Sequence, residues 1–310
     1  MKILVTGGAG FIGSYLCRRL LKGKVKPIVL DNLSIGKKEN VPLGCEFVKG
    51  DIRNFSLAKR LVKQVDAIYH LAANVTIRGS VDKFYKDAQT NIMGTLNLLR
   101  ACKESKRVKK FIFSSSMAIY ADSPKPIPIS ENYKKEPISP YGIAKLASER
   151  YILVACQQMG IESTILRFFN TYGPGQTYTP YVGVITIFIN RLLNNQPLLI
   201  FGDGEQQRDF IYVGDVVEAA YRVLKAKTRS QVFNVGTGMA TSVNQIAKML
   251  TKRINPHMQL IYSPAQPGEL RNSIADSAKL EKATKFKPST RLEEKINEVI
   301  SYIQKGKIYQ

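Results

Sequence analysis

The feature that most constrains the fold is a glycine-rich segment near the start of the chain, T-G-G-A-G-F-I-G at residues 6–13. It follows a short apolar run, residues 3–5, and it begins a stretch in which apolar residues recur with helical spacing, residues 11–21. Glycine at these places permits a tight turn, close approach of the backbone to a phosphate, and close packing of the helix on the strand. The segment therefore predicts a dinucleotide site, with the diphosphate at the amino end of the helix.

An acidic residue, Asp31, ends the second predicted strand, residues 27–30. At that place a carboxylate can accept hydrogen bonds from a ribose diol and would repel a 2′-phosphate. Asp31 therefore predicts NAD rather than NADP as the cofactor. The alternative is that the glycines only form a turn, and a strand, a helix and an acidic residue in register count against it.

The same alternation of apolar runs with helical patterns continues through two-thirds of the chain. It predicts an α/β fold, a doubly wound parallel sheet of the Rossmann type. The predicted strands are residues 3–5, 27–30, 46–48, 67–70, 110–113 and 163–168, and the predicted covering helices are residues 11–21 and 82–102.

After about Arg167 the pattern loosens, and Pro and Gly separate shorter helical segments. These predicted helices are residues 184–193, 216–224, 242–253 and 292–303. We expect residues 1–169 to form an NAD-binding domain, to which the chain returns near 210–238. Residues 170–310 are then a smaller, mixed α/β substrate lobe.

The formal net charge of +22 is compatible with nucleic acid, an acidic surface or a polyanionic small ligand as partner. The lysines are spread along the chain and do not form one tail, which favours the small ligand. The four cysteines are isolated and there are only two histidines, so we expect neither a metal site nor disulfides. The longest apolar run, residues 182–189, is far shorter than the ~18 residues of a membrane span, and no leader pattern opens the chain. We expect a cytoplasmic protein.

A candidate proton-transfer group lies in S-P-Y-G-I-A-K at residues 139–145. Serine and proline mark a helix start there, so Tyr141 lies in the first turn and Lys145 one turn later on the same face. Acting as a base near neutrality requires a large fall in the pKa of the phenol from ~10. Three positive sources could supply it: the Lys145 ammonium, the helix N-terminus and an oxidised nicotinamide ring. Ser116, at the carboxyl end of another predicted strand, offers a hydroxyl to a reacting sugar oxygen.

These motifs, in this order, resemble the extended short-chain dehydrogenase/reductases, the NAD-dependent epimerase/dehydratase group, and look most like its UDP-glucose 4-epimerase branch. Further segments carry the likeness over nearly the whole chain: L-R-F-F-N-T-Y-G-P at 166–174, F-G-D-G at 201–204, Q-R-D-F-I at 207–211, N-V-G-T-G at 234–238 and P-G-E at 267–269. The resemblance implies that Ser116, Tyr141 and Lys145 are catalytic. Tyr141 would take the proton of the sugar 4-hydroxyl, and a transient 4-keto sugar would be reduced on its other face.

The resemblance also implies two sets of binding residues. Those for NAD are Gly7, Gly10, Phe11, Ile12, Gly13, Asp31, Asn32, Leu33, Ser34, Gly36, Asp51, Ile52, Leu71, Ala72, Ala73, Thr90, Ser114, Tyr141, Lys145, Phe168 and Phe169. Those for a UDP-sugar are Ser116, Tyr141, Asn170, Val184, Leu199, Phe201, Arg208, Glu269, Arg271 and Ser273.

Two positions after the serine narrow the reaction. Related dehydratases and decarboxylases resemble this chain but carry acids beside the catalytic hydroxyl, whereas here Met117 and Ala118 cannot move a proton. Epimerisation at C4 is therefore the leading hypothesis, and a UDP-glucuronate epimerase or a nucleotide-sugar reductase is the alternative. A non-catalytic NAD-binding or RNA-binding protein is the hypothesis from another class, and the charge alone suggests it.

Two positions at which this chain is compared with the family pattern concern the substrate. Gln266 stands where many relatives have an arginine for the diphosphate, which leaves Arg208 and Arg271 to carry that role. Ser273 aligns with a position that gates space beside the sugar C2, and a small residue there resembles enzymes that also accept N-acetylhexosamines. By resemblance we expect a homodimer formed through residues 82–102 and 141–158.

Overall fold

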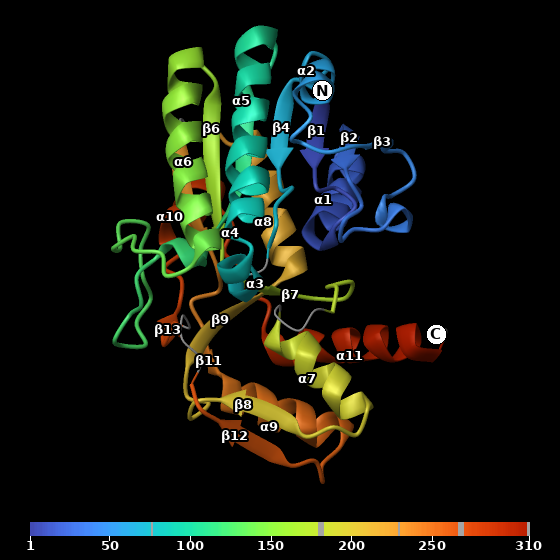
Figure 1. Ribbon diagram of the computed structural model, residues 1–310, viewed down its shortest axis with the longest axis vertical. Coiled ribbons are helices and arrows are strands. Elements are labelled where there is room, and N and C mark those ends of the chain that lie inside the picture. Colours follow the sequence, from blue (N-terminus) through green and yellow to red (C-terminus); the bar gives the residue numbers. More distant parts are fainter. Residues whose placement is uncertain (76, 179–182, 229, 266–269, 309–310) are drawn as a thin grey trace.

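The computed structural model describes residues 1–75, 77–178, 183–228, 230–265 and 270–308, and it has a larger and a smaller lobe (Figure 1). A seven-stranded parallel sheet crosses the larger lobe in the order β10-β6-β5-β4-β1-β2-β3. Its strands are β1 (Lys2–Thr6), β2 (Lys26–Asp31), β3 (Glu46–Lys49), β4 (Ala67–His70), β5 (Lys110–Ser116), β6 (Glu162–Phe168) and β10 (Gln231–Val235).

Side chains of β1 alternate between the two faces of this sheet, as a buried central strand requires. Ile3 and Val5 join the core under one layer of helices, α1 (Phe11–Lys22) and α8 (Val213–Lys225), beside which α10 (Ala278–Thr284) lies. Leu4 joins the core under the other layer, α2 (Phe55–Val62), α5 (Gly94–Ser105) and α6 (Pro140–Met159). The predicted Rossmann-type α/β fold is confirmed.

The predicted helix at residues 82–102 is present from Phe84, and it contains a π-helical turn. The chain forms α3 (Ile77–Asp82), leaves helical geometry at Lys83, and resumes as α4 (Phe84–Ala88), a π-helical turn (Gln89–Met93) and α5. In the π-helical turn the Asn91 side chain is held by the Asn74 backbone, donating to its carbonyl oxygen at 3.0 Å and accepting from its N–H at 2.8 Å. Such side-chain anchors are invisible to apolar periodicity, which is why the sequence predicted neither the π-helical turn nor the break at Lys83.

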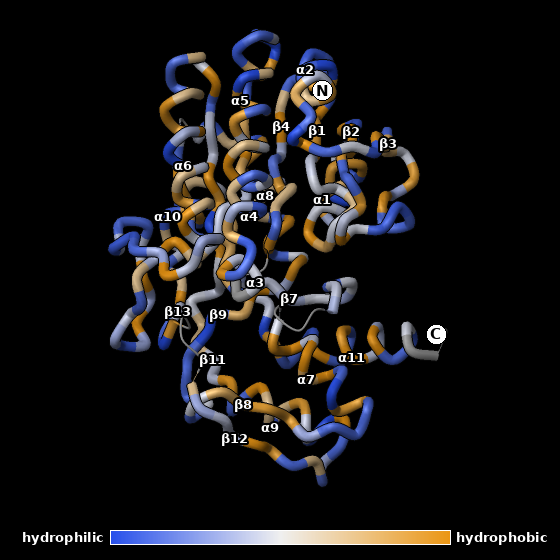
Figure 2. The backbone as a smooth tube through the Cα atoms, viewed as in Figure 1, coloured by the Kyte–Doolittle hydropathy of each residue, from blue (hydrophilic) through white to orange (hydrophobic). Residues whose placement is uncertain are grey.

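The smaller lobe packs three helices and short strands around its own core, in which Phe188, Ile246 and Val299 are buried. Figure 2 shows hydrophobic stretches on α7 and α9 within this lobe. The elements are β7 (Asn170–Tyr172), α7 (Val184–Leu193), β8 (Leu198–Phe201), β9 (Gln207–Tyr212), β11 (Ala240–Ser242), α9 (Val243–Ile254), β12 (Leu260–Ser263), β13 (Asn272–Ser273) and α11 (Leu292–Ile308). β9 is central, since β7, β11 and β13 all pair with it.

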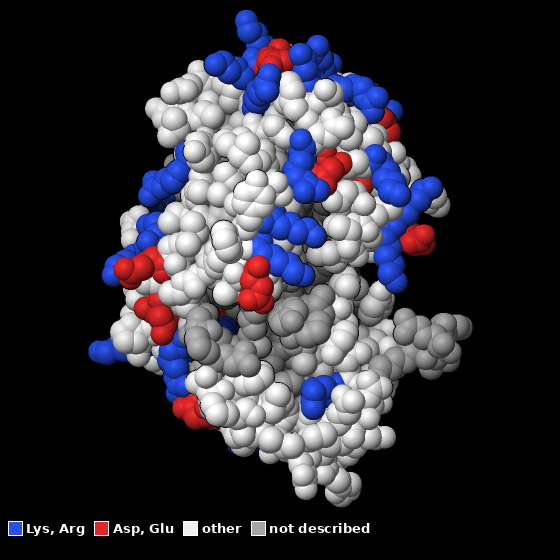
Figure 3. Space-filling model, viewed as in Figure 1, with Lys and Arg blue, Asp and Glu red and all other residues white. Residues whose placement is uncertain are grey.

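Basic side chains outnumber acidic ones on the visible face of the molecule. Figure 3 shows Lys and Arg side chains gathered at the upper end of the molecule, where α2 and α5 end in Figure 1, with few acidic side chains among them. No helix in the described part of the chain is both long and apolar enough to cross a membrane.

Candidate active site

Two adjoining cavities lie at the carboxyl ends of the parallel strands, where open α/β sheets place their ligands. One of about 330 Å³ runs along the glycine loop, and one of about 640 Å³ extends into the smaller lobe. Ser116, Tyr141, Phe168, Phe169 and Thr171 line both. The shared wall means that a ligand in one cavity can meet a ligand in the other.

The glycine loop leaves no room for side chains. Gly7 has a positive φ of +73°, and a Cβ there would lie 2.7 Å from the backbone nitrogen of Ala72. A Cβ on Gly13 would lie 2.1 Å from the Gly7 carbonyl oxygen. The loop therefore brings bare backbone to the amino end of α1, the arrangement that binds a diphosphate.

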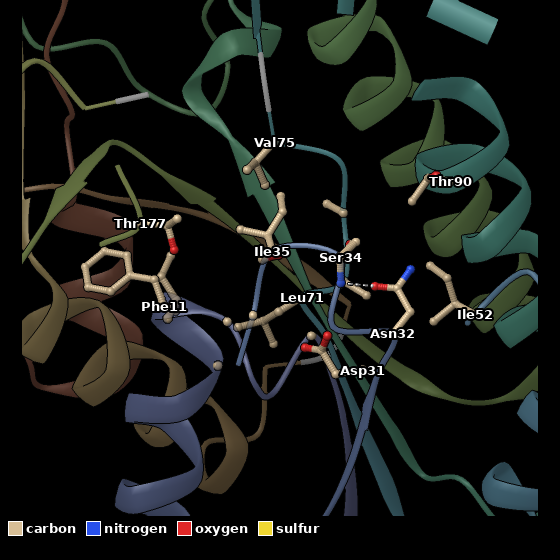
Figure 4. Close-up of a pocket in the computed structure, with 18 of the residues that line it drawn as sticks. Phe11, Asp31, Asn32, Ser34, Ile35, Ile52, Leu71, Val75, Thr90 and Thr177 are labelled. Atoms are coloured by element: carbon tan, nitrogen blue, oxygen red, sulfur yellow. Dashed lines mark hydrogen bonds between the residues drawn. The ribbon is translucent and has the colours of Figure 1, made fainter. Parts of the chain in front are cut away.

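Asp31 and Asp51 are acidic side chains that line this cavity, and Asp31 lies at the carboxyl end of β2. Its Oδ2 accepts from the Ala9 N–H at 3.0 Å and its Oδ1 from the Leu33 N–H at 2.8 Å, so the carboxylate is fixed while it lines the cavity. In Figure 4, Asp31 lies at the end of its strand close to Asn32 and Ser34, which are joined by a hydrogen bond from the Ser34 N–H to the Asn32 side-chain oxygen. The bare loop and the fixed carboxylate fit a dinucleotide.

The predicted cofactor residues gather around this cavity with one exception. Leu33 does not line it and contributes only its backbone N–H, with a positive φ of 59°. The predicted residues that do line it are Gly7, Gly10, Phe11, Ile12, Gly13, Asp31, Asn32, Ser34, Gly36, Asp51, Ile52, Leu71, Ala72, Ala73, Thr90, Ser114, Tyr141, Lys145, Phe168 and Phe169.

The candidate catalytic side chains come from α6 and β5. Ser139 caps α6 by accepting the Gly142 N–H at 3.1 Å, and Pro140 follows as the first helical residue, so the predicted helix start is confirmed. Tyr141 is 8% exposed and hydrogen-bonded to the Ser116 hydroxyl. Lys145 is 2% exposed and donates from Nζ to the Ser114 carbonyl oxygen at 2.7 Å.

The protein by itself does not make Tyr141 acidic. Burial raises the pKa of the phenol to about 12, against the hydrogen bond from Ser116, and the Asp87 carboxylate raises it further. Burial also lowers the pKa of Lys145 to about 8, while the Asp87 and Glu149 carboxylates oppose that fall. Without the cofactor, burial therefore dominates, and the pKa of Tyr141 lies above its ordinary value and not below it.

Two buried acids near this site were not predicted. Glu149 forms a two-pronged ion pair with Arg167, with Nε to Oε1 at 2.9 Å and Nη2 to Oε2 at 2.7 Å. Asp87 is 0% exposed and accepts from the Asn91 amide at 2.9 Å. Neither carries a motif in the sequence, and the spacing of Asp87 and Asn91, one turn apart, is the only signal that could have pointed to them.

The second cavity collects most of the predicted substrate residues. Asn170, Val184, Leu199, Phe201 and Arg208 line it with Ser116 and Tyr141, and so do Met117 and Ala118. Arg191, on α7, also lines this cavity and donates from Nε to the Pro197 carbonyl oxygen at 2.6 Å. Arg191 was not predicted, because an arginine in a helical pattern is usually a solvated surface residue.

Three predicted substrate residues stand apart. The Arg271 guanidinium forms a two-pronged ion pair with Asp203, at 2.7 and 2.9 Å, and it does not line the cavity. Ser273 is buried on β13 opposite Arg208, outside the cavity lining. Glu269 lies outside the described residues, as does Gln266. No cluster of three potential metal ligands occurs in the described ranges.

A family model, described as the NAD dependent epimerase/dehydratase family, matches residues 3–236. The chain belongs to this family. It is 39% identical over 303 residues to the putative UDP-glucose 4-epimerase of Methanocaldococcus jannaschii, covering 97% of this chain and 98% of that protein.

Solved structures of nucleotide-sugar epimerases are also similar to this chain. The UDP-glucose 4-epimerase of Thermotoga maritima, crystallised with UDP-glucose, has a TM-score of 0.94 and 39% identity over 99% of both chains. The UDP-glucuronic acid 4-epimerase of Bacillus cereus, in complex with UDP-glucuronic acid and NAD, has a TM-score of 0.91 and 33% identity over 98% of this chain and 99% of that one. The family member described here is an NAD-dependent enzyme that resembles the UDP-glucose 4-epimerases among the isomerases.

Proposed function

We propose that this enzyme inverts C4 of a UDP-sugar, UDP-glucose and UDP-galactose first and their N-acetylated counterparts second, through a transient 4-keto sugar. The observation that carries the proposal is the shared wall of the two cavities, where Ser116 and Tyr141 face both ligand spaces and the next two residues, Met117 and Ala118, are not acids. In this proposal residues 1–169, with the returning segment near 210–238, hold the cofactor, and residues 170–310 hold the nucleotide sugar.

The chain's residues supply the proton chemistry. Tyr141 accepts the proton of the 4-hydroxyl, and Ser116, hydrogen-bonded to the phenol, holds the same sugar oxygen in place. NAD, when bound in the first cavity, supplies a hydride acceptor and a positive ring charge, the third of the positive sources that favour an ionised phenol. Lys145, fixed on the Ser114 carbonyl oxygen, adds its own charge to the same wall.

The residues after the serine limit the reaction to this proton transfer. Met117 is 9% exposed and Ala118 is 5% exposed, and both line the second cavity. Neither can give or take a proton, so these two positions supply no acid–base group for elimination of a hydroxyl. Inversion at C4 needs a single acid–base group, and Tyr141 provides it.

The nucleotide end is assigned to the two arginines of the second cavity. Arg208 from β9 and Arg191 from α7 give this cavity two guanidinium groups, which match the charge and geometry of a diphosphate. In this proposal the two arginines replace the diphosphate-binding arginine that many relatives carry where this chain has Gln266. Acceptance of N-acetylated sugars rests on the size of the cavity, about 640 Å³, since Ser273 does not line it.

We also propose a cytoplasmic homodimer. An apolar surface is exposed on α3, α4 and the π-helical turn, and another on α6, which contacts α4 and that turn. Apolar surface of this extent on neighbouring helices suits burial against a second copy. Its residues are Val81, Phe84, Tyr85, Met93, Ile143, Tyr151 and Val154.

The test is incubation of the purified enzyme with UDP-galactose, UDP-N-acetylgalactosamine and UDP-glucuronic acid, without added NADH, with free galactose as the control. We expect UDP-glucose from the first, followed by chromatography or NMR of the product. The second candidate is a UDP-glucuronic acid 4-epimerase, favoured by the likeness to the Bacillus cereus enzyme. Epimerisation of the uronic acid alone would select it, and no epimer from any nucleotide sugar would reject both.

A further inference from the structure

Asp87 is a buried carboxylate to which the reaction assigns no task. It is 0% exposed on α4, and one oxygen, Oδ1, accepts from the Asn91 amide at 2.9 Å. The other oxygen, Oδ2, has no hydrogen-bond partner among the described residues. A buried carboxylate with half its oxygens unbonded is costly unless a positive charge is close.

The nearby positive charge belongs to Lys145. This ammonium is also buried, on α6, which packs against α4 and the π-helical turn. Its Nζ donates to the Ser114 carbonyl oxygen and lies 4.6 Å from the centre of the Phe113 ring. No carboxylate of the described chain lies within ion-pair distance of Nζ, so its charge must be balanced from farther away.

The other titratable groups around Lys145 cannot serve as that balance. Glu149, on the same helix, is already paired through both oxygens with Arg167 of β6. Burial and the Lys145 charge lower the pKa of His70, on β4, to about 3, so this ring is neutral. Tyr141 carries no charge while its pKa is about 12. Among the described residues, Asp87 is the remaining acid whose charge acts on Lys145.

We propose that Asp87 is the counter-ion of Lys145, a positioning residue that keeps the catalytic ammonium charged in a site that burial makes hostile to charge. Asn91 holds the carboxylate in place, since its amide bridges Asp87 and the Asn74 carbonyl oxygen at 2.9 and 3.0 Å. Asp87 lies on α4 and Asn91 in the π-helical turn, and both of these elements pack against α6, from which Ser148 donates to the Asn91 carbonyl oxygen.

The directions of the pKa shifts agree with this pairing. The Lys145 charge opposes the rise that burial causes in the Asp87 pKa, and Asp87 is the first group to oppose the fall that burial causes in the Lys145 pKa. Asp87 also raises the pKa of Tyr141. The carboxylate therefore keeps Lys145 protonated and makes ionisation of the phenol depend on a further positive charge.

A double-mutant cycle on unfolding free energy tests the pair without substrate or cofactor. We expect Asp87→Asn to destabilise the wild-type protein, because Lys145 loses its counter-charge. In a Lys145→Met background we expect the same change to stabilise, because no cation then balances the carboxylate. Ser148→Ala, which removes a bond to the Asn91 carbonyl oxygen, is the matched control and should be additive with Lys145→Met. Additive effects of Asp87→Asn would overturn the proposal.

A second measurement reads the charge of Lys145 directly. In protein labelled with ¹³C at lysine Cε, the signal lost in Lys145→Met should titrate near pH 8 in the wild type. In Asp87→Asn it should titrate lower by about 1 pH unit or more, and in Ser148→Ala it should not move. Asp87→Ser replaces Asp87→Asn if the amide is not tolerated. An unchanged midpoint in the Asp87 variant would overturn the proposal.

The consequence for turnover rests on the proposed function. The alkaline limb of kcat/KM against pH should move to lower pH in Asp87→Asn, with kcat falling more than KM rises, since the nucleotide-sugar contacts are untouched. Should the wild type act on no nucleotide sugar, the proposed function fails while the cycle and the titration still decide the role of Asp87. A merely structural role would lower stability and leave the pH profile in place.

Discussion

In the cofactor half of the cleft, backbone conformations hold the site residues in place, whereas in the substrate half side chains on separate segments do so. The positive φ of Gly7 and the close approach of Gly13 to the Gly7 carbonyl are properties of one short segment. Arg191 and Arg208 line one cavity only because α7 and β9 pack around the core of the smaller lobe. A contiguous motif therefore determines one half, and tertiary packing determines the other.

Tyr141 stands where the halves meet, so Tyr141→Phe should have the largest effect on activity. Removing one phenolic oxygen deletes the proton acceptor, and kcat should fall by ~10²–10⁴ while bound NAD and KM stay near their wild-type values. The measurement is steady-state epimerisation together with the dinucleotide content of the purified protein. Tyr302→Phe, an exposed tyrosine on α11 that lines neither cavity, is the control and should be indistinguishable from wild type.

Gly13→Ala tests the cofactor half of the cleft, in which the backbone conformation determines the site. The added Cβ would lie 2.1 Å from the Gly7 carbonyl oxygen, so the loop must move away from the helix terminus. NAD affinity should fall by at least about 100-fold, measured by fluorescence titration, because the diphosphate loses its cradle. Gly306→Ala, at a position where nothing lies within 4 Å of the new Cβ, should bind NAD normally. Equal losses in both variants would mean that stability, not loop geometry, is the cause.

Lys145→Met should lower the activity of the enzyme and raise its stability at pH 7. The folded pKa of Lys145, about 8, lies below its ordinary value of 10.5, so protonation in the native state costs stability at pH 7. That cost is present below pH 8 and disappears as the pH rises through the interval from 8 to 10.5. The variant should therefore be more stable than wild type at pH 7, by on the order of 3 kcal/mol, and no more stable near pH 11. Urea denaturation at both pH values measures this, and a constant difference would contradict it.

The sequence predicted the features that depend on local motifs, and it missed those that depend on tertiary packing. The glycine segment, Asp31 and the Tyr141–Lys145 spacing predicted the Rossmann fold, NAD and the face of α6, because each is a local pattern with one geometric solution. Arg271 was assigned to the diphosphate by alignment alone, and its partner Asp203 lies far from it in sequence. The bond between Asp87 and Asn91 joins α4 to a π-helical turn, which apolar spacing does not predict. Side-chain partners across the fold leave no periodic trace in the chain.

Arg208→Met tests the half that is assembled by packing. A guanidinium bonded to a charged group contributes ~1.5–3 kcal/mol, so KM for the UDP-sugar should rise by roughly 10- to 100-fold with little change in kcat. Arg191→Met should act in the same sense, since it lines the same cavity. If Arg191→Met lowers thermal stability and leaves KM unchanged, its bond to the Pro197 carbonyl oxygen is its whole role.

Arg271→Ala should have the smallest effect, although alignment places Arg271 with Arg208. Its guanidinium is 47% exposed and already bonded through two nitrogens to Asp203, whose own pKa it lowers to about 2. Exposed ion pairs contribute little to stability, typically ~0–1 kcal/mol, because water and salt screen them. KM for the UDP-sugar should therefore change by less than about twofold, with Asp203→Ala as the matched control. A rise in KM as large as that of Arg208→Met would mean that the ion pair with Asp203 opens when the substrate binds. The sequence-based assignment of Arg271 to the diphosphate would then be correct.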